Sequence, residues 1–351
     1  MNRQEHFNDF LPSWIKSEGE AGDVTISSRI RLARNFKGYP FPSYAKQEQL
    51  KQVVEEITGI IKNKPPLEPM AVIKVEDLSQ NDRLILVEKH LCSPQFIEKP
   101  QNRTLLVNQE QSVSIMVNEE DHLRIQAITP GFTLEEALGL ANRIDDYLEE
   151  HIDLCFDENC GYLTACPTNA GTGIRASVML HLPGLAMVDQ VKKVLAALTH
   201  IGISIRGLYG EGTESMGDIY QISNSVTMGH SETDLASNLK SVCRQLIERE
   251  RAVREALMRD SKIQLEDRIC RSYGVLTQAR MLTSQEALKL LSDVKLGLEL
   301  GIIPVNDKSV IKELMFIIRS SILQKIIGKE LSPAERDYYR ASVVRDKLKI
   351  V

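Results

Sequence analysis

Apolar and polar residues alternate along several stretches in the first two thirds of the chain, the pattern typical of strands with one buried face. Residues 23–34 and 112–117 fit this pattern well, since they are rich in β-branched side chains and contain neither Gly nor Pro. A polar turn at 118–121 joins the second of these to the next strand as a hairpin. Strands are predicted over residues 23–34, 112–117, 122–128, 161–166, 174–182, 201–206 and 218–222.

Helical spacing of apolar residues separates these strands and dominates the last part of the chain. In residues 49–63 apolar side chains recur three and four positions apart, as on the buried stripe of a helix. Thr133 followed by Glu136 matches a capping box, a polar signal that begins helices. Helices are predicted over residues 49–63, 133–148, 188–201, 232–260, 284–300 and 308–328.

Neighbouring strands in this order could pair antiparallel, so the pattern favours an α+β fold over a doubly wound sheet, followed by an all-helical C-terminal domain. We expect the boundary near residue 255, which gives the domains 1–255 and 256–351. The charge-dense helix at 232–260 either connects the two domains or forms the seam of a homodimer.

Composition narrows the class of protein. The chain has 351 residues and a formal charge of -5, which argues against a protein that coats nucleic acid. No run of 18 apolar residues and no secretion signal occurs, so we expect a cytoplasmic protein without a membrane span. Cys155, Cys160 and Cys166 cluster, but without a CxxC or a pair of histidines they predict neither a disulfide framework nor a zinc site.

Arginines carry the first sign of chemistry. No phosphate-binding loop of the GxxxxGK[ST] type occurs, but arginines lie repeatedly at strand ends and beside glycine loops. Guanidinium groups are permanently charged and bidentate toward phosphate oxygens, so several together could hold a nucleoside triphosphate. Each one alone is better explained as a surface or ion-paired side chain, and only the repeated position favours a phosphate site. The arginines in question are Arg29, Arg31, Arg124, Arg175 and Arg206.

Carboxylates gather in two loops. Residues 118–122 (NEEDH) place three of them in a hairpin turn, where their repulsion is unfavourable unless a cation relieves it. Glu211 lies on a second loop, between two glycines. Taken singly, each loop fits an ordinary solvated surface, yet two carboxylates on either side of a guanidinium could align it and accept its proton.

Four motifs occur in an order that resembles the phosphagen (guanidino) kinases, which include the creatine and arginine kinases. The motifs are Ser27-Ser28-Arg29-Ile30-Arg31, NEEDHLR at 118–124, CPTN with GTGIR at 166–175, and RG at 206–207 running to Glu211 with DIYQISN at 218–224. This resemblance implies an antiparallel sheet flanked by helices. It also implies phosphoryl transfer from ATP, with Mg²⁺, to a guanidinium nitrogen.

The resemblance assigns roles residue by residue. Glu120 is similar to the family's carboxylate that orients and deprotonates the guanidinium, Glu211 to the second substrate acid, and Cys166 to a cysteine beside the guanidinium. The five arginines look like the phosphate cradle. The residues so assigned to the nucleotide are Ser27, Ser28, Arg29, Ile30, Arg31, His90, Arg124, Arg175, Ala176, Ser177, Val178, Met179, Arg206, Gly207, Leu208, Tyr209 and Gly210. No metal ligand from the protein is implied.

Two departures favour one branch of the family. Small-molecule phosphagen kinases carry a helical domain before the SSRxR strand, whereas here that strand begins near residue 24. We expect this difference to open the site to a guanidinium attached to a polypeptide. Over a hundred mostly helical residues follow the 218–224 motif, and this layout resembles the bacterial protein arginine kinases.

The C-terminal run AERDYYRA at 334–341 carries the same closer resemblance. It is similar to a phosphoarginine-binding pocket that acts as an allosteric sensor, which assigns this role to Arg336, Asp337, Arg340 and Ala341. Arg336 and Arg340 lie one helical turn apart and could grip one phosphate, while Asp337 could meet a guanidinium. The alternative interpretation is a solvated helix end.

The resemblance further implies a role in the heat-stress response. Phosphorylated arginines would mark proteins for a Clp unfoldase and protease and release a heat-shock repressor from DNA, with a zinc-containing activator protein as partner. The other expected partners are protein substrates with exposed arginines, and direct contact with nucleic acid or membrane is not expected. Two alternatives stay open: a free-arginine kinase, and a non-catalytic adaptor that binds phosphoarginine proteins.

Overall fold

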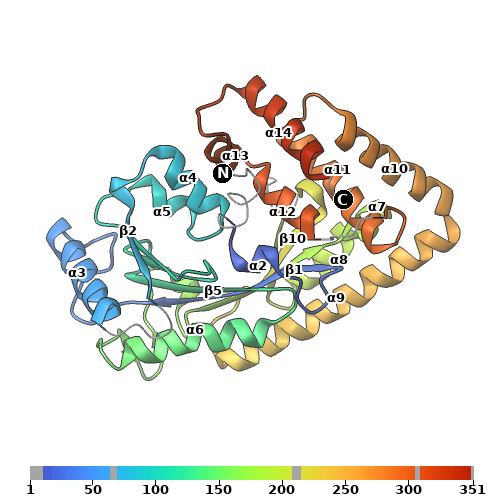
Figure 1. Ribbon diagram of the computed structural model, residues 1–351. Coiled ribbons are helices and arrows are strands. Elements are labelled where there is room, and N and C mark those ends of the chain that lie inside the picture. The colour runs from blue at the N-terminus through green and yellow to red at the C-terminus, as the bar shows by residue number, and fades with distance from the viewer. Residues whose placement is uncertain (1–10, 64–68, 208–214, 305–308, 349–351) are drawn as a thin grey trace.

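The computed structural model describes residues 11–63, 69–207, 215–304 and 309–348. Within them, an eight-stranded sheet forms the centre of the molecule, and all of its strand pairs are antiparallel (Figure 1). Helices lie on both sides of the sheet, which confirms the predicted α+β fold. The strands follow in the order β2 (Ala71–Lys74), β3 (Thr104–Val107), β4 (Val113–Val117), β5 (Leu123–Pro130), β1 (Thr25–Arg34), β8 (Ile174–His181), β10 (Ile219–Asn224) and β9 (Ile203–Gly207).

The predicted strands coincide with observed ones, with one large difference in length. The strand expected over 161–166 shrinks to β7 (Gly161–Tyr162), which pairs only with β6 (Phe156–Asp157) in a small separate hairpin. The chain leaves the ladder because the Ala165 N–H donates to a carboxylate of another segment instead of to a strand. The short strands β2 and β3 were not predicted, since four residues are too few to show an alternating pattern.

Four helices cover one face of the sheet. They are α3 (Gln47–Asn63), α6 (Leu134–Glu149), α8 (Val191–Thr199) and α9 (Glu232–Asp260). Their apolar stripes pack against the sheet residues Ile30, Ile125 and Val178, all of which are fully buried. In Figure 1, α6 and α9 run along the underside of the sheet. This layer therefore forms the main core with one face of the sheet, and it does not cover the opposite face of the central strands.

The capping box predicted at Thr133 is wrong, although α6 does begin there. Thr133 makes no side-chain bond to the helix backbone. Its hydroxyl donates instead to the Pro130 carbonyl oxygen at 2.9 Å, because the tight turn after β5 brings that oxygen closer than the helix N–H groups.

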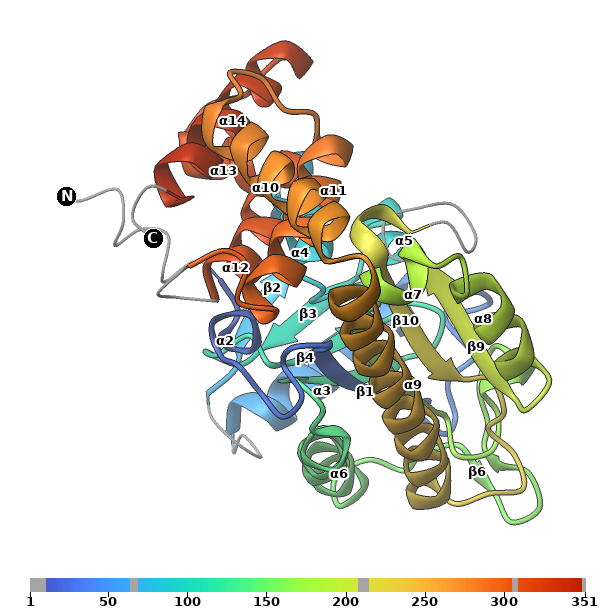
Figure 2. The same cartoon turned by 90° about the vertical axis from the view of Figure 1, so that its right-hand side faces the viewer.

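Helices from the end of the chain pack above the other face, over one end of the sheet (Figure 2). Leu291 and Leu314 of this layer share a core with Ile128 and Met179 of the sheet. Of the remaining helices, α7 contacts α9, and α4 contacts α5 and α13. The helices outside the four-helix layer are α2 (Ser13–Lys16), α4 (Gln80–Glu88), α5 (Pro94–Glu98), α7 (Pro183–Met187), α10 (Lys262–Gln278), α11 (Ser284–Glu299), α12 (Ser309–Ile317), α13 (Ser320–Ile327) and α14 (Pro333–Leu348). Short 3-10 turns lie at Val75–Asp77, Pro167–Asn169 and Met216–Asp218.

The single helix predicted over 308–328 is two helices, α12 and α13. The break falls at Ile318 and Arg319, where Arg319 has extended backbone angles. The Ile318 carbonyl oxygen accepts a bond from Arg340 on α14, and the carboxylate of Glu88 accepts the first N–H groups of α13. These two contacts satisfy backbone groups that a continuous helix would have paired internally.

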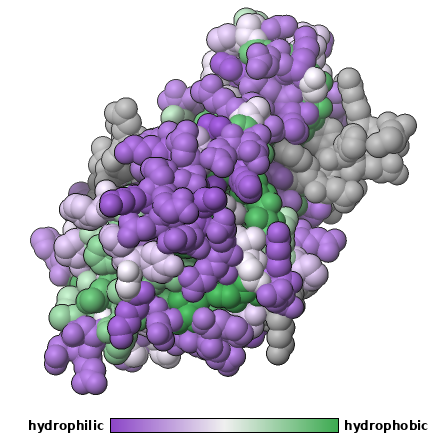
Figure 3. Space-filling model, turned by 90° about the vertical axis from the view of Figure 1, so that its left-hand side faces the viewer, coloured by the Kyte–Doolittle hydropathy of each residue, from purple (hydrophilic) through white to green (hydrophobic). Residues whose placement is uncertain are grey.

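The region around the predicted domain boundary at 255 lies inside α9, which continues to Asp260 before α10 begins at Lys262. The surface on the side of α3 is mostly hydrophilic, with small apolar areas between polar side chains (Figure 3). Within the described part of the chain, every helix is too short or too polar to serve as a membrane span.

Candidate active site

The structure gathers four of the predicted arginines on three adjacent strands. Arg31 on β1 stands directly opposite Arg175 on β8, and Arg29 stands opposite Ser177. Arg124 lies on β5, the other neighbour of β1, two register positions beyond the residue opposite Arg31. Because side chains alternate along a strand, these guanidiniums all project from the same face, away from α6 and α9.

The fifth arginine extends the cluster toward the sheet edge. Arg206 on β9 pairs with Gln221 on β10, and Gln221 pairs in turn with Met179 on β8. Arg206 therefore shares the arginine face, and its side chain is exposed. The strand register thus places all five arginines on one face of the sheet.

Neutral side chains orient two of these guanidiniums. Arg29 donates from Nη2 to Oε1 of Gln221 at 2.7 Å and from Nε to Oγ of Ser177 at 3.3 Å. Arg175 donates from Nη2 to Oγ of Ser204 at 2.9 Å. Gln221 and Ser204 carry no charge, so they hold the guanidiniums in place without neutralising them. The sequence analysis did not identify either residue. Gln221 belongs to the DIYQISN motif, and Ser204 pairs with Ser223 of the same motif, so the motif could have indicated both.

The arginines repel one another across the site. Burial, together with the charges of Arg124 and Arg175, lowers the pKa of Arg29 to about 10. Burial and the neighbouring Arg29 also hold the pKa of Arg31 well below its usual range. The buried Nε atoms of Arg31 and Arg175 have no hydrogen-bond partner. Unused donors among like charges fit a ligand with several anionic oxygens, such as a polyphosphate.

The three carboxylates of the acidic turn beside the arginines have different partners. Glu119 forms an ion pair with Arg124, with Oε2 at 2.7 Å from Nη1, and accepts a hydrogen bond from Ser93. Although burial acts in the opposite direction, Arg124 lowers the pKa of Glu119. Asn118 takes a left-handed φ of 63°, which bends the chain tightly enough to bring these groups together.

Asp121 links this turn to the loop that carries Cys166. Its Oδ1 accepts the Ala165 N–H at 2.7 Å and the side-chain amide of Asn35 at 2.7 Å. Glu120, between the two anchored acids, is exposed, and the neighbouring Cys166 thiol, which also contacts the Thr168 hydroxyl at 3.0 Å, acts to lower the pKa of its carboxyl group. Burial and the charge of Asp121 raise the pKa of Glu120. The structure therefore brings together Glu120 and Cys166, which are far apart in sequence.

Glu211, the second predicted acid, lies outside the described residues, as do Leu208, Tyr209 and Gly210. Gly207, the last described residue before them, ends β9 and pairs with Tyr220. His122, the last residue of the acidic turn, is fully buried against the rings of Phe36 and Tyr39.

Four residues assigned to the nucleotide direct their side chains to the face of the sheet opposite the arginines. Ser28, Ile30, Ala176 and Val178 are all fully buried on the face covered by helices. Their side chains cannot touch a ligand on the arginine face, because neighbouring residues of a strand point to opposite faces. Met179 is on the arginine face but packs into the core below the C-terminal helices.

His90 lies at the edge of the arginine face. Its ring packs against Trp14 and Phe316, with ring centroids 6.0 Å and 5.6 Å apart. With Ser27 and Arg29 it lines a small cavity. Burial and the positive charges of Arg319 and Arg29 hold the pKa of His90 well below its usual range, so the imidazole is neutral at pH 7. This position keeps His90 within the region expected for the nucleotide.

The predicted phosphoarginine residues lie on α14 in an arrangement that differs from the expected one. Arg340 is 2% exposed and donates to the carbonyl oxygens of Ile318 and Leu282 at 2.8 and 2.7 Å. Asp337 accepts from the same Arg340 at 2.5 Å. Ala341 is buried in the helical core, while Arg336 is partly exposed. Arg340 is therefore tied to backbone and to Asp337, and Arg336 is the more accessible of the two cations.

Comparison with known proteins places this site in a family. Residues 51–253 match the model of the ATP:guanido phosphotransferase C-terminal catalytic domain, and residues 262–351 match that of the protein-arginine kinase McsB C-terminal domain. The chain is 45% identical to a protein-arginine kinase of Geobacillus sp. over 100% of this chain and 97% of the relative. It is 48% identical to one of Moorella thermoacetica over 95% and 97%.

Solved structures of phosphagen kinases share this fold. The duplicated taurocyamine kinase of Schistosoma mansoni with bound transition state analog components is 28% identical, with a TM-score of 0.59 over 67% of this chain. The match spans 35% of that longer chain. A lombricine kinase that is 24% identical shares the fold, with a TM-score of 0.58 over 68% of this chain and 69% of the other. The chain thus belongs to the ATP:guanido phosphotransferases, in the group formed by the protein-arginine kinases.

Proposed function

We propose that this protein transfers the γ-phosphoryl group of ATP to arginine side chains of proteins. One observation carries the proposal: five arginines converge on one face of the sheet, beside the pair formed by Glu120 and Cys166. Full-length relatives named protein-arginine kinase support a protein-borne acceptor over free arginine.

The arginine face would hold the phosphates of ATP. Arg31 and Arg175 have unpartnered Nε donors, and Arg29 is pre-oriented by Gln221, so little reorganisation is needed when the anion enters. Fixed donors of this kind stabilise the charge that develops on the transferring group. Mg²⁺ would enter on the phosphates, since the described residues hold no group of three metal-ligating side chains. When bound, it would neutralise phosphate charge.

Glu120 would prepare the acceptor. A guanidinium is a poor nucleophile because it is protonated at neutral pH and its nitrogen lone pairs are delocalised. Glu120 would orient the reacting nitrogen and take its proton as the N–P bond forms and the bond from the γ-phosphorus to the leaving oxygen breaks. Cys166 lies beside this carboxylate and would contact the same guanidinium. We assign Glu211 the second contact, on the basis of its motif.

We further propose that the phosphoarginine marks proteins for a Clp protease and inactivates a heat-shock repressor, and that a zinc-containing protein activates the kinase. The motif at 334–341 supports a phosphoarginine sensor, in which Arg336 would make the first contact because it is more accessible than Arg340. These assignments rest on the sequence resemblance.

The test of the chemistry is incubation with ATP labelled at the γ-phosphate and an arginine-rich protein. The label should be acid-labile, as expected of a phosphoramidate, whereas an acid-stable label would mean a hydroxyl acceptor. Glu120→Gln should reduce transfer about a hundredfold or more, while ATP affinity changes less than twofold, since Glu120 is outside the arginine face. Glu136→Gln, an exposed change on α6, is the matched control.

Free arginine distinguishes the alternative enzyme. A free-arginine kinase would phosphorylate the amino acid as efficiently as an arginine-rich protein, so comparable kcat/KM values would refute the protein-borne acceptor. The sensor has its own test: Arg336→Ala should leave basal transfer unchanged and remove stimulation by added phosphoarginine, and unchanged stimulation would refute that assignment.

A further inference from the structure

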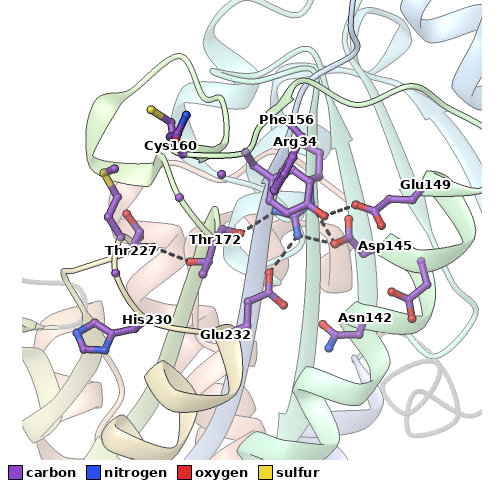
Figure 4. A pocket seen from close by; sticks show the side chains of 17 residues that line it. Arg34, Asn142, Asp145, Glu149, Phe156, Cys160, Thr172, Thr227, His230 and Glu232 are labelled. Carbon is purple, nitrogen blue, oxygen red and sulfur yellow. Dashed lines mark hydrogen bonds and ion pairs between the residues drawn. The ribbon is translucent and has the colours of Figure 1, made fainter.

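A cavity of about 520 Å³ opens beside the candidate active site, on the other side of the loop that carries Cys166. The end of β1, the C-terminal half of α6, the β6–β7 hairpin and the start of α9 surround it (Figure 4). It is separate from the arginine face and plays no part in the proposed transfer. The lining residues that matter here are Arg34, Asp145, Asp146, Glu149, Tyr162 and Glu232.

The cavity carries an excess of negative charge. Four of its lining side chains are carboxylates, and Arg34 is its single lysine or arginine. Asp146 and Glu149 are exposed on α6, and the Glu149 carboxylate also accepts a hydrogen bond from the Tyr162 hydroxyl. Such a wall attracts cations and repels phosphates, which is the reverse of the preference of the arginine face.

Arg34 shows which cation this wall accommodates. Its guanidinium lies 3.5 Å from the centre of the Tyr162 ring. Its Nη2 donates to Asp145 at 2.5 Å and to Glu232 at 3.1 Å. Figure 4 shows Arg34, Asp145 and Glu232 converging from β1, α6 and α9. An aromatic face combined with carboxylates is the environment that suits a guanidinium or an ammonium group.

Acceptors in this wall remain after Arg34 is satisfied. Asp145 is 5% exposed, and its second carboxylate oxygen, Oδ1, is buried without a hydrogen-bond partner. Oδ1 of Asn142, one helical turn earlier, is also buried and unpartnered. Burial raises the pKa of Asp145 to about 6, against the effect of Arg34. Two acceptors of this wall are therefore unused, and they add to its negative potential.

A metal ion fits less well than an organic cation. No group of three metal-ligating side chains occurs among the described residues, this cavity included. The rim adds apolar contact surface instead, since Phe156 is 59% and Met228 is 49% exposed. Carboxylates beside exposed apolar groups suit the long aliphatic stem and charged head of a lysine or arginine side chain.

Hydrogen bonds connect residues at the cavity to the acidic turn that carries Glu120 and to the loop after Cys166. Arg34 lines it, and the next residue, Asn35, donates to Asp121 beside Glu120. Thr227, also on its wall, donates to the carbonyl oxygens of Thr168 and Ala170 in the loop after Cys166. A polypeptide seated in the cavity would thus lie close to the proposed acceptor position.

We propose that this cavity is a docking subsite for a second basic side chain, lysine or arginine, of the polypeptide substrate. The proposal rests on the proposed function for its biological meaning, while binding of the basic segment can be measured without any phosphoryl transfer. Phosphorylation would convert a bound arginine into an anion, which the carboxylate wall repels.

Direct binding tests the site. The probe is a fluorescent peptide of lysine, serine and glycine without arginine, followed by anisotropy at low salt. The double variant Asp146→Asn with Glu149→Gln neutralises exposed acids without breaking the Arg34 pair, and should weaken the peptide about threefold to tenfold. The control, Glu150→Gln with Asp153→Asn, removes equal charge from exposed positions outside the cavity and should bind normally. Equal affinity for the two double variants would overturn the proposal.

Kinetics provide the second measurement. With an arginine peptide flanked by lysines, the cavity variant should raise KM by a similar factor and leave kcat unchanged. With N-acetyl-arginine amide, which carries one basic group, neither constant should change. A fall in kcat for both acceptors would refute docking and indicate damage to the catalytic turn. If no variant transfers phosphate to arginine, the proposed function fails, while the lysine-peptide measurement still judges the cavity.

Discussion

Arg31 is a cation that the protein holds in place without an acceptor for its Nε. Burial and the charges of Arg29, Arg124 and Arg175 disfavour its protonated form. An anion that binds here would relieve this repulsion. Arg31 therefore lowers the stability of the nucleotide-free protein and raises its affinity for the phosphates. Its pKa is lowered in the folded protein, so folding is disfavoured wherever the unfolded chain carries this proton, which is the case at pH 7.

Arg31→Met should therefore raise the free energy of unfolding by about 1 kcal/mol at pH 7, because it removes an unpaired, repelled charge. It should at the same time abolish measurable ATP binding. Urea denaturation and nucleotide titration check both. Arg143→Met, on the exposed side of α6, should leave stability and binding unchanged. A loss of stability in Arg31→Met would show that the repulsion is already compensated.

Asp121 sets the protonation of its neighbour. After burial, its charge is the largest influence that raises the pKa of Glu120. Asp121→Asn keeps an oxygen for Asn35 and Ala165 but removes the charge, so Glu120 should ionise at lower pH. The acidic limb of kcat/KM against pH should then move to lower pH. An unmoved limb would mean that another group acts as the base.

At the scale of elements, Glu88 joins two parts of the chain. Its carboxylate accepts the N–H groups of Ser321 and Ile322 at 3.1 and 2.8 Å, and so caps α13 from α4. A carboxylate at a helix N-terminus satisfies free N–H groups and complements the helix dipole.

Glu88→Ala should lower the free energy of unfolding by about 1–2 kcal/mol, because three hydrogen bonds and the favourable charge are lost. Glu76→Ala, an exposed acid on the same side of the sheet, provides the control for charge alone. Chemical denaturation measures both. Equal effects of the two changes would mean that the cap contributes nothing specific.

Local pattern predicts elements well where the apolar period is long. The stripe in α3 and the run that forms α9 are recognised almost to their ends. The break between α12 and α13 is invisible to such a pattern, because Ile317, Ile318 and Ile322 keep a helical spacing across it. Arg340 and Glu88 cause the break from distant positions. The short strands β2 and β3 likewise depend on neighbours in the sheet.

At the scale of the whole molecule, the family resemblance predicts the arginine cluster together with Glu120 and Cys166, whereas the apolar pattern alone predicts neither. The sequence pattern only places the five arginines at strand ends and beside glycine loops. The contact between Glu120 and Cys166 depends on Asp121 binding Ala165 and Asn35, contacts between segments that no local pattern reports. The motif was transferred as a continuous run, whereas a strand presents only alternate side chains to one face, so four of the assigned residues direct their side chains away from the arginines.

Nucleotide binding should stabilise the whole fold, because the arginine face is strained only in its absence. At a hundredfold excess over Kd, ATP should add about 2.7 kcal/mol to the free energy of unfolding. The matching rise in the unfolding temperature should be lost in Arg31→Met. A rise of the same size in that variant would place the nucleotide elsewhere.

The first family model ends at residue 253, inside α9, and the second begins at residue 262, at the start of α10, but the apolar core is continuous across this junction. Ile128 and Met179 on the sheet are covered by side chains from the C-terminal helices. A fragment ending at residue 260 would turn that shared apolar seam toward water and would self-associate or precipitate. The sheet and the C-terminal helices therefore complete each other's core, and we expect neither segment to behave as an independent module.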